Sequence, residues 1–262
     1  MLKLKKALSS AFFVAWVSAN SVFAACVPNS GLEPVAITKV VDGDTVRLSS
    51  GRSVRLLGIN TPELNPRTGN PEPYAKEAQQ LLQALSRGAE AKVVLGTEAE
   101  DRYKRLLAHL VLDGRNAAQA LLERGLGWAV VIEPNTSQAD CLMAAESRAR
   151  ASQLGVWANP VRPAGELNRG GFAVVQGEVT RIDATQKYIY LEIDDHLALR
   201  LTRKHFSPKQ IVSFGKALGR KVEARGWVID RRAKLKAGSR YKGFLLPLGS
   251  QWHLSFIEAR DK

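Results

Sequence analysis

The chain has 262 residues, of which 45% are hydrophobic and 24% are charged; this balance is typical of globular protein and excludes disorder, collagen and coiled coil for the chain as a whole. The length suits one large domain or two small ones. The formal net charge is +13, and residues 172–262 carry most of the excess, with 18 basic and 9 acidic side chains, which favours a polyanionic partner over a basic surface that serves only solubility.

Residues 1–24 have the pattern of a secretory signal peptide. Three lysines lie among the first six residues, residues 7–17 are mostly apolar, and small residues lead up to Ala24. We expect cleavage after Ala24 and an exported protein, either periplasmic or secreted. The apolar stretch is too short to span a bilayer comfortably, so a retained anchor is the weaker alternative and the mature chain is expected to have no membrane span.

Two cysteines are present, Cys26 and Cys141, and both lie in the part expected to be exported. In an oxidising compartment they pair most simply with each other, which would tie the start of the mature chain to a helix. The alternatives are two unrelated thiols, or a lipid on Cys26, because Phe23-Ala24-Ala25-Cys26 loosely resembles a lipoprotein cleavage box.

The next part of the chain is predicted to begin with strands. Residues 35–58 contain three β-branched or alternating runs, separated by turn signals around Gly43 and Gly51. A polar, proline-containing loop follows over residues 61–73. Residues 74–85 then place apolar side chains at helical spacing, which predicts a helix.

Strands and helices continue to alternate beyond this helix. Asn116 is expected to cap a helix that reaches Glu123. A last helix is expected to begin near Ser137, with Asp140 as a capping-box acid, and to reach Gly155. Further strands are predicted at residues 91–95, 105–112 and 128–132.

The chain divides again near its middle. Residues 159–171 contain two prolines and three glycines without apolar periodicity, which predicts a linker. Beyond it we expect five strands, at residues 172–183, 188–193, 198–202, 221–228 and 252–257, with helix-like residues at 208–218. A five-stranded unit with one inserted helix suggests a small barrel of the oligonucleotide/oligosaccharide-binding (OB) type.

Three short clusters contain side chains suited to phosphodiester chemistry. Asp44 and Glu63 supply carboxylates, and hard oxygen donors of this kind suit Ca²⁺ or Mg²⁺. Arg55 and Arg105 supply planar guanidinium groups that fit phosphate oxygens. A divalent cation, a carboxylate that orients water and two arginines suffice to hydrolyse a phosphodiester. Each cluster alone has a plainer interpretation, as a hairpin turn at Asp42 or as a surface ion pair.

In order and spacing, residues 35–158 resemble the staphylococcal nuclease (thermonuclease) family. The resemblance runs from the segment that holds Asp42 and Asp44 to the Leu-Gly-Val-Trp sequence at residues 154–157. It implies a five-stranded OB-fold barrel with three helices. It also implies endonucleolytic hydrolysis of DNA and RNA that leaves 3′-phosphate ends, with one Ca²⁺ ion as cofactor.

The resemblance assigns a role to each matching position. Glu63 is implied to activate the attacking water, while Arg55 and Arg105 hold the phosphate. The implied metal ligands are Asp44, Asn60 and the Thr61 carbonyl, with Asp42 behind them, and Arg102 and Tyr103 are implied to contact the nucleotide.

Two positions depart from the family. Asn60 stands where the family has a second metal-binding aspartate, so the Ca²⁺ site loses one negative charge and is expected to bind the ion weakly or not at all. The strand at residues 128–132 lacks the tyrosines on which the family stacks a base. Either Trp128 or the C-terminal domain replaces that contact, or affinity falls.

The C-terminal domain interleaves cations with aromatic residues, a pattern typical of sequence-independent nucleic-acid binding. At least half of these aromatics are expected to be core instead, and an anionic cell-envelope surface is another possible partner. The basic residues are Arg200, Arg203, Lys204, Lys209, Lys216, Arg220, Lys221, Arg231, Arg232, Lys234 and Lys236, and the aromatics are Tyr188, Tyr190, Phe206, Trp227, Tyr241 and Trp252.

Together these observations predict a mainly β protein with helices (α+β). It consists of a signal peptide (1–24), a nuclease-like barrel domain (25–158), a linker (159–171) and a smaller, basic OB-like barrel (172–262). The predicted function is that of an exported, monomeric, Ca²⁺-dependent endonuclease that cuts DNA and RNA with little sequence preference. The alternative is a catalytically silent nucleic-acid-binding or cell-envelope protein that keeps the fold, and Asn60 favours it.

Overall fold

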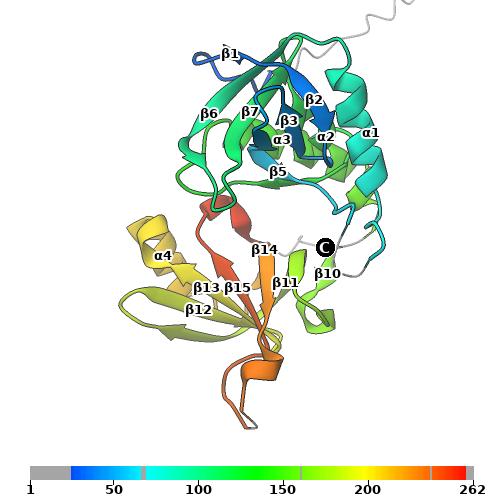
Figure 1. The fold of residues 1–262 in the computed structure, drawn as a ribbon. Coiled ribbons are helices and arrows are strands. Elements are labelled where there is room, and N and C mark those ends of the chain that lie inside the picture. The colour runs from blue at the N-terminus through cyan, green and yellow to red at the C-terminus, as the bar shows by residue number, and fades with distance from the viewer. Residues whose placement is uncertain (1–24, 66–68, 160, 237, 258–262) are drawn as a thin grey trace, which may run out of the picture.

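A computed structural model describes residues 25–65, 69–159, 161–236 and 238–257. The expected signal peptide, residues 1–24, lies outside this part. The described chain forms two hydrophobic cores, one built from residues 26–145 and the other from residues 164–248. They correspond to the upper and lower bodies in Figure 1.

The first core is enclosed by a five-stranded barrel. Its strands are β2 (Ile37–Val40), β3 (Thr45–Leu48), β4 (Ser53–Leu56), β7 (Leu106–Leu112) and β6 (Ala91–Glu100), in that spatial order. The short β1 (Glu33–Pro34) pairs with β6, and Val35 N donates to Ala91 O at 2.9 Å, so the segment that leads into β2 closes the barrel. The parallel pair is β4 with β7. This is the strand order of the OB fold, as expected.

Helices and one small sheet cover this barrel. The helices are α1 (Ala75–Ser86), α2 (Ala117–Leu122) and α3 (Ala139–Ala151), and the small sheet pairs β5 (Gly58–Asn60) with β9 (Trp128–Val130). The predicted cap of α2 is confirmed, because the Asn116 side chain accepts from Ala118 N at 2.9 Å. β8 (Arg115–Asn116) pairs with β7 just before it.

The predicted capping box of α3 is wrong. The cap residue is Gln138, in a left-handed conformation with φ 62° and without a capping side-chain bond. Asp140 instead accepts a hydrogen bond from Trp252 Nε1 at 3.0 Å, so its carboxylate serves a contact with the C-terminal part of the chain. The helix ends at Ala151, and a short 3₁₀ turn (Gly155–Trp157) follows.

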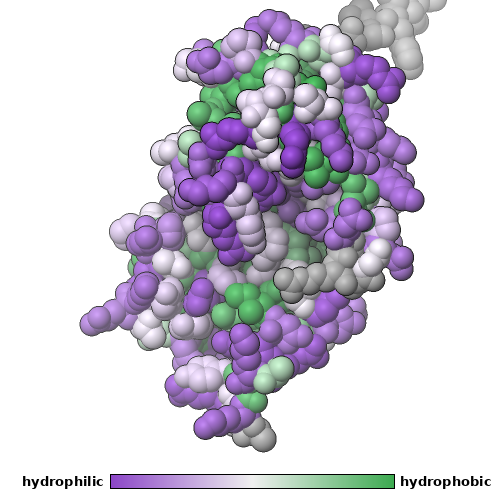
Figure 2. All heavy atoms as spheres, viewed as in Figure 1, coloured by the Kyte–Doolittle hydropathy of each residue, from purple (hydrophilic) through white to green (hydrophobic). Residues whose placement is uncertain are grey.

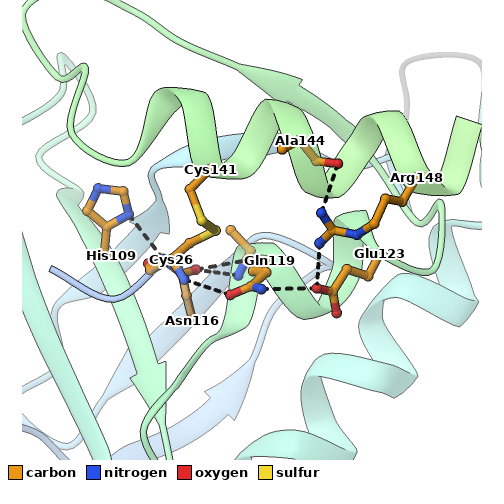
Figure 3. The surroundings of a disulfide bond; sticks show 9 residues. Cys26, His109, Asn116, Gln119, Glu123, Cys141, Ala144 and Arg148 are labelled. Carbon is orange, nitrogen blue, oxygen red and sulfur yellow. Dashed lines mark hydrogen bonds and ion pairs between the residues drawn. A yellow bond between two sulfur atoms is a disulfide. The ribbon is translucent and has the colours of Figure 1, made fainter. Parts of the chain in front are cut away.

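The predicted disulfide is present and joins Cys26 to Cys141 on α3 (Figure 3). Cys26 is fully buried, and its backbone is held on both sides: Cys26 N donates to Gln119 Oε1 at 2.8 Å, and Asn116 Nδ2 donates to Cys26 O at 2.7 Å. This pairing leaves neither sulfur free for the alternative of a lipid on Cys26.

The second core is also enclosed by a five-stranded barrel. Its strands are β11 (Gly171–Ala184), β12 (Tyr188–Ile193), β13 (Leu197–Thr202), β15 (Phe244–Leu248) and β14 (Lys221–Asp230), and β14 pairs back onto β11. The parallel pair is β13 with β15, and α4 (Pro208–Gly215) stands between β13 and β14 in the chain. The second OB-like barrel expected from the sequence is therefore formed.

One of its five strands differs from the prediction. The fifth barrel strand is β15, whereas the predicted strand at residues 252–257 is reduced to β16 (Leu254–Phe256), which pairs with β14 at the far side of the sheet. The sequence hides β15 because its apolar run does not alternate and contains Pro247. A proline, which has no N–H, argues against an inner strand.

The predicted linker is largely part of the second barrel. β10 (Arg162–Pro163) pairs in parallel with β11, and Ala164 and Leu167 are buried in the second core. The prediction missed this because two isolated apolar side chains show no periodicity.

The two barrels are joined by one buried and one partly exposed ion pair between α3 and the outer face of β14. Arg225 Nη1 lies 2.6 Å from Glu146 Oε2 and also donates to Ala129 O at 3.2 Å. Arg150 contacts Glu223 through both of its terminal nitrogens, at 2.8 and 2.6 Å. Burial raises the pKa of Glu146, and the Arg225 charge opposes that rise.

A histidine completes this junction. Val131 N donates to His253 Nε2 at 2.9 Å, and His253 is buried. Burial and the nearby Arg225 charge lower the pKa of His253 to about 4. The ring is therefore neutral at pH 7, with its proton on the other nitrogen.

In the described part of the chain, no helix combines the length and apolar character needed to cross a membrane.

Candidate active site

The loop between β2 and β3 places the side chain of Asp44 in the interior of the protein. Asp42 Oδ1 accepts from Asp44 N at 3.0 Å, which closes a tight turn around Gly43. A side chain at Gly43 would begin 2.6 Å from Ala78 Cβ and 2.7 Å from Thr61 Oγ1, so the turn fits against α1 only as glycine. The Asp-Gly-Asp sequence thus serves both the turn and the placement of Asp44.

Asp44 is the centre of the cluster. It is only 5% exposed, and its Oδ2 lies 3.0 Å from Arg55 Nη2. The same oxygen accepts from Thr61 N at 2.9 Å and from Thr61 Oγ1 at 3.2 Å. Three donors therefore converge on one carboxylate oxygen, which fixes its position before any ligand arrives.

Arg55 is held as firmly as its partner. It projects outward from β4, the third barrel strand, and its Nη1 donates to Leu56 O and Ile59 O, both at 2.8 Å. Its Nη2 donates to Asn60 Oδ1 at 3.2 Å. Asn60 therefore joins the cluster through its amide oxygen, the atom expected to bind the metal.

Glu63 lies in the loop that leaves this cluster. Its backbone is anchored to Glu72, since Glu63 N donates to Glu72 Oε2 at 3.0 Å and Glu72 N donates to Glu63 O at 2.9 Å. Burial and then the Asp44 charge raise the pKa of Glu63, whereas Arg55 and Arg105 act to lower it. These influences place Glu63 within the electrostatic range of all three residues.

Asp42 has an even more strongly perturbed carboxyl. Burial, followed by the Asp44 charge, raises the pKa of Asp42 to about 6. Burial is the first cause of the raised pKa at both Asp42 and Glu63, and the Asp44 charge adds to it, so several carboxyl groups lie within electrostatic reach of one another. Such a group of carboxyls favours the binding of a cation.

The loop between β6 and β7 contributes the second arginine. Arg105 N and Arg105 Nε donate to the Asp101 carboxylate at 3.0 and 2.7 Å, and Tyr103 N donates to it at 2.8 Å. Arg102 Nη2 donates to Tyr103 Oη at 2.8 Å, and this ring is 65% exposed. Asp101 is thus a positioning residue that sequence reasoning left without a role, although its place four residues before Arg105 was a usable signal.

Of the expected metal ligands, Thr61 contacts Asp44 directly and Asn60 is linked to Asp44 through Arg55, but they do not form a ready-made metal site. Among the described residues, no group of three or more His, Cys, Asp or Glu side chains has that arrangement. Asp44 and Asn60 supply hard oxygens, and the contacts of Thr61 with Asp44 run through its N–H and hydroxyl. With Asp42 and Glu63 beside it, this all-oxygen set fits a hard divalent cation of modest affinity.

Comparison with known proteins agrees with this geometry. Residues 53–159 match the family model described as "Staphylococcal nuclease homologue". These residues form a domain of the staphylococcal nuclease family. The match contains Arg55, Asn60, Thr61, Glu63 and the whole of the second arginine loop, and the loop that holds Asp44 precedes it.

Relatives of this nuclease-like domain include several named nucleases. Two from Bacillus subtilis (strain 168) are the "SPbeta prophage-derived endonuclease YokF", 31% identical over 131 residues, and "Endonuclease YncB", 30% identical over 128. These alignments cover 48% and 47% of this chain and 44% and 61% of the relatives, so the chain spans about half the length of either one. The "Thermonuclease" of Staphylococcus hyicus is 25% identical over 134 residues, which are 50% of this chain and 79% of that protein.

Proposed function

We propose that the chain is an exported endonuclease that hydrolyses phosphodiester bonds of DNA and RNA with little sequence preference, depends on Ca²⁺ and leaves 3′-phosphate ends. The observation that carries this proposal is the buried Asp44–Arg55 pair, with Glu63 and Arg105 near it at the loop end of the first barrel. The names of the relatives support nuclease activity in general.

Each side chain has a distinct task in this proposal. Glu63 accepts a proton from the attacking water, and its raised pKa moves it toward neutral pH, where a general base works best. The water oxygen bonds to phosphorus while the bond from phosphorus to the 5′ oxygen breaks, and the departing 5′ oxygen takes a proton from solvent. Arg105 is anchored through Nε, so its terminal nitrogens are the donors that can reach a phosphate oxygen.

Asp44, Asn60 and Thr61 would hold the Ca²⁺ ion. When bound, the ion supplies charge stabilisation to the phosphate oxygens. Since Asn60 replaces a carboxylate, we expect the ion to dissociate readily, in about the 10⁻⁴–10⁻³ M range of weak extracellular sites.

The second barrel is proposed to hold the nucleic-acid backbone. Basic side chains lie beside two aromatic rings of the second barrel, half-buried Tyr188 and exposed Tyr241. Lys187 and Arg200 lie 5.3 and 5.2 Å from the centre of the Tyr188 ring. Arg240 lies 5.2 Å from the centre of the Tyr241 ring. Cations beside aromatic faces bind single strands irrespective of sequence.

Export is proposed from the pattern of residues 1–24. The Cys26–Cys141 disulfide supports it, because such bonds persist in oxidising compartments. Cell fractionation with the native leader and with residues 2–24 deleted tests it, and equal amounts in the periplasm or medium from both forms would contradict it.

The decisive experiment is plasmid digestion by the mature chain with Ca²⁺ and with a chelator. Glu63→Gln should lower the rate about 10²–10⁴-fold, because it removes the general base, while the variant still retards DNA in a gel. Glu77→Gln, the same change at an exposed site on α1, is the matched control. Equal rates for Glu63→Gln and the parent would remove Glu63 from the reaction. Retardation without any Ca²⁺-dependent cutting by the parent would favour the silent binder.

A further inference from the structure

A pocket of about 250 Å³ opens between the two barrels. Its wall from the first barrel is the segment that follows β9 and includes Ile132 and Glu133. Its wall from the second barrel includes Trp227, Ser250 and His253. Figure 2 shows hydrophobic side chains near the level where the two bodies meet, surrounded by hydrophilic ones.

The walls of this pocket leave apolar surface in contact with solvent. Ile132 is 54% exposed and Trp227 is 42% exposed, although both stand where the barrels meet and could have been covered by the junction. Large apolar side chains that stay exposed beside a pocket mark a binding site more often than a defect of packing.

The pocket also contains a polar group without a partner. Ser250 is 1% exposed, and no described residue supplies a hydrogen bond to its Oγ. Buried hydroxyls are nearly always bonded, so this one needs a ligand or an ordered water. His253 faces the same pocket and is fixed by its bond from Val131 N, which leaves its Nδ1–H as a donor.

A row of aromatic rings links the pocket to the nuclease site. Trp128 pairs across the small sheet with Asn60, the residue that touches Arg55. Its ring lies 5.1 Å from the Phe172 ring, which lies 5.2 Å from the Trp227 ring. Trp128 is thus half-buried against the second barrel, and the aromatic row that begins beside the site ends in the ring that is exposed.

We propose that this pocket binds an unpaired nucleobase of the substrate strand, with the Trp227 ring as the stacking surface and Ser250 Oγ as a hydrogen-bond partner for the base edge. A base has the two features that complement this pocket: a flat apolar face that can stack on Trp227, and polar atoms on its edge that can bond to Ser250. The second barrel would thereby supply a base contact next to the nuclease site. The inference rests on the proposed function only in taking nucleic acid as the ligand.

The test measures binding without cutting. In the Glu63→Gln background, Trp227→Ala should weaken binding of a fluorescently labelled single-stranded oligonucleotide about 5- to 150-fold, the range that one stacked base corresponds to. Trp227→Tyr should keep most of the affinity. Leu218→Ala, which removes an exposed apolar side chain elsewhere on the second barrel, is the control and should leave affinity unchanged.

An abasic scan of the same oligonucleotide separates stacking from folding. One abasic position should weaken binding to the parent and have no effect on Trp227→Ala, because both changes remove the same contact. An abasic effect that persists in Trp227→Ala would overturn the proposal, as would unchanged affinity in that variant. Digestion by the otherwise unaltered protein is scored separately, so failure of the base contact and failure of the nuclease function give different results.

Discussion

The two barrels of this protein share one topology and differ in what lies at their loops. In each, the third strand pairs in parallel with the fifth, a helix follows the third strand, and the third strand presents an arginine on its outer side. In the first barrel that arginine, Arg55, meets Asp44 at 3.0 Å. In the second, Arg200 lies over the Tyr188 ring instead.

The difference begins in the loop between the first two strands. The first barrel carries Asp42 and Asp44 there, whereas the equivalent residues of the second, 185–187, include a lysine and no acid. The long loop of residues 231–243 adds further cations. The same frame thus carries a polar cluster suited to a cation in one barrel and a surface suited to polyanions in the other, and the two differ mainly in their loops.

The largest effect is expected where the two barrels meet. Glu146→Ala would remove the closest charged partner of the buried Arg225 and the acceptor of Ala129 N, and should lower the free energy of unfolding by about 3–5 kcal/mol. Urea unfolding measures it, with exposed Glu77→Ala as the control. The double variant Glu146→Leu, Arg225→Met should regain most of the loss, since it removes both charges of this pair together. A loss under 1 kcal/mol in Glu146→Ala would mean that the barrels are joined without this pair.

A smaller effect is expected on the pH dependence of stability, through His253 at the junction of the barrels. The pKa of His253 is about 4 in the folded chain and about 6.5 when unfolded, so the unfolded state binds the extra proton between these values. Stability should therefore fall as pH drops from 6.5 to 4, by about 3 kcal/mol in all. His253→Gln, which keeps an acceptor for Val131 N, should remove this share when unfolding is followed across that range.

His109 is the matched comparison, because burial lowers its pKa to about 4 in the first domain, where its ring lies beside Asn116 near the disulfide. His109→Gln should flatten the pH dependence by a similar amount without changing contact between the barrels, as judged by protection of Val131 N–H from hydrogen exchange. Equal pH slopes for His253→Gln and the parent would contradict the neutral, accepting state of His253.

The smallest effect concerns the cations of the second barrel. Lys187→Ala and Arg240→Ala should each reduce the slope of log affinity against log salt by about 0.7 if each contacts one phosphate of a single strand. Titrations of single-stranded DNA at several salt concentrations measure the slope. Arg124→Ala, exposed on the first barrel, should leave it unchanged. If the slope falls equally in Lys187→Ala, Arg240→Ala and Arg124→Ala, the second barrel is not the part of the protein that holds the phosphates.

Much of the first barrel could be predicted from the sequence because its signals are local. Alternation in residues 53–56, the Asp-Gly turn and the Asn116 cap each specify a neighbouring backbone geometry, and all three are present in the structure. The cluster around Asp44 was also predictable, since its members follow one another within twenty residues. Their chemical roles remain predictions.

The rest depends on contacts between distant segments. Pro247 concealed a strand whose pairing is set by β13 and β14, and Asp140 looked like a cap because its partner, Trp252, lies 112 residues away. No role was assigned to Arg225 from the sequence, and the contact between the barrels buries it. No local sequence pattern predicts the pocket at Trp227 and Ser250, since residues of both barrels line it.

Helix α3 is fastened twice along its length, to the chain start through Cys141 and to the second barrel through Glu146 and Arg150. Each added or removed residue turns the following part of a helix by about 100°. A one-residue deletion between Cys141 and Glu146 would therefore swing the downstream carboxylate and guanidinium away from their partners while the upstream cross-link held. Evolution can vary the composition of this helix far more freely than its length.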